Sequence, residues 1–162
     1  MKTWPTLITL IVLTSQPCTA QATDRLKDLR AVNASTYLVG GDFSESSESR
    51  ATFERNLENA FRTGLEGMGI DLLGNNINRL TCTVKLHVND PYAAFSIEVD
   101  KREIVAPWNL SRGGTFNWDE RMEAVTWGVS IPGMVGLAAL SGEDFGSFCV
   151  ELFDREWREA NN

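Results

Sequence analysis

The sequence predicts an α+β fold, a two-layer sandwich in which two helices pack on one face of a largely antiparallel sheet of about four to five strands. Two observations predict it: two segments have apolar residues at helical spacing, and several others alternate apolar and polar residues as strands do. Elements that are apolar on one side only must bury that side, and two layers bury both kinds. The 162 residues suffice for one such domain.

The first 22 residues resemble a secretory signal peptide. Lys2 provides a positive start, residues 6–13 are apolar, and Ala20 and Ala22 give the small-x-small pattern of a cleavage site. The apolar run is shorter than the roughly 20 residues that cross a bilayer. We therefore expect a cleaved signal peptide at 1–22, a single domain at 23–162, and no membrane span after signal removal.

Cys18 raises the alternative of a lipoprotein, in which a cysteine becomes the lipidated first residue. Bacterial lipoprotein signals place a small residue before that cysteine, whereas Pro17 precedes Cys18. The sequence therefore favours simple cleavage, and a periplasmic or secreted location.

The charge of the mature chain narrows the range of partners. Removal of residues 1–22 takes away Lys2 and no acid, which leaves 14 basic and 22 acidic residues and a net charge of −8. Nucleic acids and anionic membranes are held mainly by clustered Lys and Arg, and the sequence has no such cluster. We expect no nucleic-acid partner; keeping the domain soluble is the simpler reason for its charge.

The first half of the domain reads as strand, helix and short strand. Alternation from Val32 to Leu38 predicts a strand that ends at Gly40 and Gly41. Residues 44–49 are serines and glutamates, which favour a helix N-terminus. Apolar residues then recur at helical spacing (Phe53, Leu57, Ala60, Phe61, Leu65), the glycines at 67 and 69 end the helix, and residues 70–73 form a short strand.

The second half reads as hairpin, strand and helix. Residues 80–88 and 95–99 alternate on either side of a turn at 89–92, which predicts an antiparallel hairpin. A loop spans residues 107–118, and a last strand with Val125, Trp127, Val129 and Ile131 on one face closes at Pro132 and Gly133. Residues 133–142 are expected to form a packed loop or an exposed binding loop. An amphipathic helix follows (Phe145, Phe148, Cys149, Leu152, Phe153, Trp157).

Two cysteines remain after signal removal. Cys82 lies on the apolar face of its strand and Cys149 on the apolar stripe of the last helix, so these faces should meet. In an oxidising compartment we expect a disulfide between them with a structural role. Two buried free thiols are the alternative. A metal site is not expected, because the pair lacks CxxC spacing and the chain has one histidine.

The sequence contains no recognisable catalytic constellation. There is no GxSxG elbow, P-loop or dinucleotide fingerprint, and no cofactor is expected. The single histidine, His87, falls on the polar face of its strand. It would need a neighbouring carboxylate to act as a base, which leaves an envelope-polymer hydrolase as the enzymatic alternative.

The two apolar loops are the candidate binding segments. Trp108 and Trp118 flank two glycines in one loop, and Met134 and Leu137 lie in the other. Aromatic and apolar loop residues often anchor a protein partner, although they also fold back onto a core. A secreted inhibitor, which needs a rigid protruding loop, is a third possibility.

The layout also resembles a loose group of small exported bacterial proteins of unknown function. The shared features are a helix running into a Gly-Ile strand at residues 61–73, a hairpin, a segment like Val125-Thr126-Trp127-Gly128, and a closing amphipathic helix. The same shape is similar to the N-terminal domains of TolB-type and curli-secretion-type periplasmic proteins. The resemblance spans residues 30–158 and implies a bacterial envelope setting without mapping any site residue.

These observations favour a non-catalytic periplasmic or secreted module for binding or assembly. Its partner would be a protein or a component of the cell envelope. Enzyme activity remains the open alternative, through His87 and a nearby carboxylate.

Overall fold

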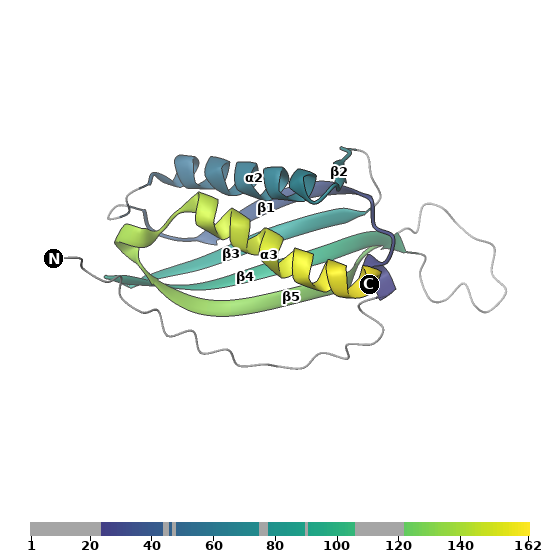
Figure 1. Ribbon diagram of the computed structural model, residues 1–162. Helices are drawn as coiled ribbons and strands as arrows, with labels where there is room; N and C mark the ends of the chain where they lie inside the picture. The colour runs from purple at the N-terminus through teal and green to yellow at the C-terminus, as the bar shows by residue number, and fades with distance from the viewer. Residues whose placement is uncertain (1–23, 44–45, 47, 75–77, 90, 106–121) are drawn as a thin grey trace.

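The computed structural model describes residues 24–43, 46, 48–74, 78–89, 91–105 and 122–162. Its elements are, in chain order, η1 (Asp24–Leu26), β1 (Ala31–Gly40), α2 (Arg50–Gly67), β2 (Asp71–Leu72), β3 (Arg79–Asn89), β4 (Tyr92–Val105), β5 (Met122–Gly136), η4 (Leu137–Ala139) and α3 (Gly142–Asn161). Helices α2 and α3 lie side by side across one face of a five-stranded sheet (Figure 1). The predicted two-layer α+β fold is confirmed.

The strand order is β2-β1-β3-β4-β5. The pairs β3–β4 and β4–β5 are antiparallel, whereas β1 pairs in parallel with β3 along most of its length and with β2 at Ala31 and Val32 only. The parallel pairs follow from the chain path, because α2 carries the chain back over the sheet between β1 and β3. The long hairpin of β3 and β4 and its extension by β5 make the sheet largely antiparallel.

The predicted ends of β1 and α2 agree with the structure. Gly40 ends β1 with a φ of +75°, which suits a residue without a Cβ. Ser49 is the N-cap of α2, and its side-chain oxygen accepts a hydrogen bond from the Thr52 amide. Gly69, with a φ of +80°, follows the helix and turns the chain into β2.

Two predictions for the last strand were wrong: its end, and the placement of Val125 on the same face as Trp127. A register shift between Lys101 and Arg102 puts Val125 opposite Arg102, on the other face from Trp127. Strand β5 continues through Pro132 and Gly133 to Gly136, so the expected loop at 133–142 consists of a strand end, η4 and the start of α3. Gly133 lies under the ring of Phe95, where a Cβ would approach the ring carbon to 2.3 Å. Pro132 is tolerated because β5 lies at the edge of the sheet, where a missing N–H leaves no partner unpaired.

The core lies between the sheet and the helices. Its largest fully buried side chains come from both layers and from η1: Phe53, Phe61, Phe153, Leu26, Leu57, Leu65, Ile70, Leu80, Ile97, Leu140, Val32 and Val84. Burying side chains of this kind is the main favourable term in folding. The disulfide between Cys82 of β3 and Cys149 of α3 crosses this core and joins the two layers.

The two helices approach closely because α3 has glycines at the contact. A Cβ on Gly142 would lie 2.1 Å from the Phe53 carbonyl oxygen, and one on Gly146 would lie 2.6 Å from the Leu57 carbonyl oxygen. Glu48, just before α2, accepts a hydrogen bond from the Gly142 amide at 3.2 Å. This glutamate therefore links the beginnings of the two helices.

Candidate functional site

The helices leave the second face of the sheet uncovered (Figure 1). We call this surface the open face. It carries the side chains that alternate with the core positions: odd-numbered residues on β1 and β3, even-numbered residues on β4, and the matching residues of β5. Since this face is part of a sheet pinned by a disulfide and a helical layer, it offers a fixed platform.

Large apolar side chains are concentrated on the open face. Seven such side chains of the described part are exposed, and six of them lie on this face: Tyr37, Val39, Tyr92, Ile104, Val125 and Met134. Their exposed fractions range from 45% for Ile104 to 61% for Met134. Only Leu73 lies elsewhere. Tyr92 and Met134 lie at one end of the sheet, Ile104 and Val125 lie at the other end, and Tyr37 and Val39 lie on β1.

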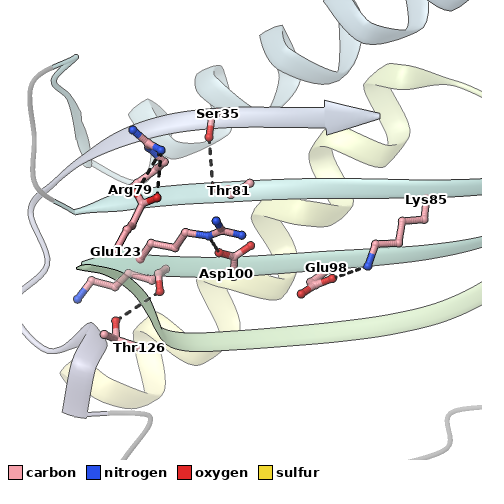
Figure 2. A network of polar contacts seen from close by, with 10 residues as sticks. Ser35, Arg79, Thr81, Lys85, Glu98, Asp100, Glu123 and Thr126 are labelled. Carbon is pink, nitrogen blue, oxygen red and sulfur yellow. Dashed lines mark hydrogen bonds and ion pairs between the residues drawn. The ribbon is translucent and has the colours of Figure 1, made fainter. Parts of the chain in front are cut away.

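The charged side chains of the open face pair with one another (Figure 2). Lys85 contacts Glu98 at 2.9 Å, and Arg79 of β3 reaches across β4 to Glu123 of β5 at 3.1 Å. Ser35 and Thr81 share a hydrogen bond at 3.2 Å. Charges that are already paired within the chain attract a charged partner only weakly. The exposed apolar side chains on this face would therefore contribute more to binding.

The centre of the open face contains a buried carboxylate. The Asp100 side chain is only 3% exposed, and it accepts a hydrogen bond from Arg102 Nε at 2.7 Å. This hydrogen bond and the negative charge of Asp100 raise the pKa of Arg102 above its ordinary value. Thr81, on the neighbouring strand opposite Asp100, is also buried. The pair is therefore a structural ion pair within the sheet.

The net charge of the chain is distributed unevenly between the two layers. Helix α3 carries six acidic residues and two arginines, a net charge of −4, whereas α2 carries three of each sign. The three cations and three anions that pair on the open face also cancel. Because like charges repel, an acidic partner would avoid α3, and the open face is the less charged surface.

The described residues contain no pairing of His87 with a carboxylate, which the enzymatic alternative requires. His87 is exposed on the open face, where it faces Ala94 of β4, and no described residue hydrogen-bonds or ion-pairs with its side chain. Lys85, two residues before His87 on the same face of β3, pairs with Glu98. Within the described ranges there is also no group of three or more His, Cys, Asp or Glu residues placed to hold a metal ion.

The structure separates the predicted binding residues. Met134 lies on the open face and is 61% exposed, whereas Leu137 is 4% exposed and belongs to the core. Trp108 and Trp118, the signal peptide at 1–22 and Cys18 lie outside the described residues. The sequence analysis looked for binding residues in loops and therefore missed Tyr37, Val39 and Tyr92. These residues alternate with core residues along β1 and β4, and this alternation indicates that they point outward.

Comparison with known proteins assigns no family. No protein-family model and no curated protein matches the sequence. Among solved structures the chain is similar to the PelC dodecamer from Paraburkholderia phytofirmans, with 12% identity, a TM-score of 0.35, and coverage of 78% of this chain and 88% of that chain. The likeness is distant and assigns no function.

None of the helices in the described segments is both long and apolar enough to span a membrane.

Proposed function

We propose that the mature chain is an exported, non-catalytic binding module that docks a protein, or a protein component of the cell envelope, on its open face. The observation that carries this proposal is that six of the seven exposed large apolar side chains of the described residues lie on one sheet face. The charged side chains between them are already paired within the chain. Such a surface loses unfavourable hydration when a partner covers it and leaves no charge unpaired.

The disulfide supports the extracytoplasmic setting. Cys82 and Cys149 are 67 residues apart in sequence and completely buried, and they are joined between the two layers. Disulfides persist in oxidising compartments and are rare in the cytosol. This agrees with the signal peptide that the first 22 residues resemble.

A charge introduced into the open face should separate the protein from its partner. We choose Met134→Glu and Val125→Glu, because both side chains are more than half exposed and their replacement leaves the core intact. The measurement is the elution volume of the exported protein in gel filtration of the host's extracytoplasmic fraction, compared with that of purified protein. Leu73→Glu is the matched control, since Leu73 is exposed to a similar degree away from this face.

The expected result is a complex that elutes early for the wild type and for Leu73→Glu, and a free monomer for the two open-face variants. Circular dichroism should show all four proteins folded. Equal elution of all four in the host fraction would contradict the proposed docking surface. A purified wild type that already elutes early would identify a second copy of this chain as the partner.

A further inference from the structure

A second surface lies beside the open face, between β1 and α2. It is a hollow of about 520 Å3, and we call it the β1–α2 groove. One side is formed by residues 36–38 of β1, and the other by the residues of α2 between Ala51 and Glu58. Leu57, which is almost fully buried, is among its lining residues. Its volume is in the range of sites that hold small ligands.

The strand side of the groove is a free sheet edge. The Asn33 and Gly41 amides donate to β3, so the backbone groups of the even-numbered residues of β1 point to the opposite side. Strand β2 covers the beginning of that side, where the Leu73 amide donates to the Val32 carbonyl. No other strand in the described part of the chain continues this pairing beyond Val32.

Arg50 covers the far end of the same edge. Its guanidinium donates to the Leu38 carbonyl at 3.1 Å and to the Gly40 carbonyl at 2.8 Å, and its Nε is held by Glu54 at 2.9 Å. These contacts leave a short window in the middle. The backbone groups that point outward there are the carbonyls of Ala34 and Thr36 and the amides of Ala34, Thr36 and Leu38.

We propose that the β1–α2 groove binds a short extended peptide that adds a strand to β1. Three donors and two acceptors in the window match the backbone of a peptide of about four to five residues, the usual basis of strand addition to a sheet edge. Side chains of a strand alternate between its two sides, so one set would enter the groove above Leu57. Valine suits these positions of the peptide, because it is small and favours an extended backbone.

The neighbouring charges do not oppose this ligand. Glu54 is paired with Arg50, and the other charged residues of the groove, Arg55 and Glu58, have opposite signs. A neutral peptide with alternating valines therefore meets no net repulsion. The site shares Tyr37 with the open face. Its recognition groups, the β1 edge and α2, are otherwise separate from that face.

The test uses the full mature protein and a defined probe, acetyl-Thr-Val-Thr-Val-Thr-amide. Amide chemical shifts in ¹H–¹⁵N NMR are followed while the peptide is added to about 1 mM, where weak complexes are still detected. We expect saturable shifts at Thr36 and Leu38 and along the groove side of α2. The same peptide N-methylated at every residue should bind at least tenfold more weakly, because none of its five residues keeps a backbone N–H to donate.

Ala51→Phe should block the groove and lower the affinity at least tenfold. Ala51 is an exposed helix residue, so the substitution leaves the core unchanged. Thr63→Phe is the control, because Thr63 is exposed on the same helix but does not line the groove. The proposal would be overturned if the probe produced no saturable shifts, if its shifts lay on the open face away from Tyr37, or if the N-methylated peptide bound equally well. None of these outcomes would affect the gel-filtration test of the open face.

Discussion

Asp100 and Arg102 show how single residues fix the open face. Both side chains leave β4 on this face, yet Asp100 is buried and Arg102 remains 41% exposed above it. A buried carboxylate that loses its hydrogen-bond partner is costly, so the arginine is held in place over the sheet. The pair thereby orders the surface between Thr81 and Gly128, the neighbours of Asp100 on the adjacent strands.

Substitution of Asp100 tests this role. Asp100→Asn keeps the shape of the side chain but removes its charge, and we expect the free energy of unfolding to fall by about 1–2 kcal/mol, since a hydrogen bond to a charged group is lost. Glu98→Gln, in the exposed pair with Lys85, should cost less than about 1 kcal/mol. Urea unfolding measures both, and equal losses would contradict a structural role for the Asp100–Arg102 pair.

The contact between α2 and α3 depends on glycine. Gly142 and Gly146 are one helical turn apart on α3, and both meet backbone atoms of α2. The sequence contains this spacing, but its meaning appears only once the two helices are seen to be neighbours (Figure 1). Close packing brings the apolar sides of both helices onto the sheet together.

We therefore predict that Gly146→Ala lowers stability. The new Cβ would lie 2.6 Å from the Leu57 carbonyl oxygen and 2.7 Å from the Ala60 Cβ, and overpacking of this kind costs about 1–3 kcal/mol. Gly67→Ala is the control. It has nothing within 4 Å of the added Cβ, and it should be neutral or stabilising by up to about 1 kcal/mol. The measurement is the thermal unfolding temperature of each variant. A fall of similar size in both would contradict a close contact at Gly146.

At the scale of the molecule, the disulfide fastens the last helix to the sheet. Closing a loop between residues 67 positions apart limits the unfolded chain, and in the chain-entropy model this stabilises the fold by about 4 kcal/mol. We expect reduction to lower the free energy of unfolding by a value of this order. A Cys149→Ala variant should not respond to the reductant. If reduced and oxidised wild type unfolded at the same urea concentration, the cross-link would have no stabilising role.

The spacing of apolar side chains made most of the fold predictable. Alternation placed β1 and the β3–β4 hairpin, helical spacing placed both helices, and together they brought Cys82 and Cys149 to facing surfaces. It did not reveal that β1 lies between β2 and β3, because the pairing of distant strands depends on the path of α2. The end of β5 was missed because Pro132 and Gly133 are read as a break, whereas an edge strand under Phe95 accepts both.

The candidate site was harder to predict than the fold. The sequence directed attention to apolar loop residues, of which Met134 is exposed on the open face and Leu137 is buried in the core. Alternation also predicts that one face of the sheet is uncovered. Which residues lie on that face is clear only once both helices are seen to pack on the opposite face. The paired charges remained hidden because Arg79 and Glu123 are far apart in sequence and belong to strands that do not touch.

The measurement that most directly tests docking on the open face is hydroxyl-radical footprinting in the native extracytoplasmic fraction and on purified protein. Tyr37, Tyr92 and Met134 report on the open face, and Leu73 reports on a surface away from it. If a partner docks on the open face, the three open-face residues react more slowly in the native fraction than in purified protein, while Leu73 reacts equally in both. Unchanged rates at Tyr37, Tyr92 and Met134, or protection at Leu73 alone, would contradict it.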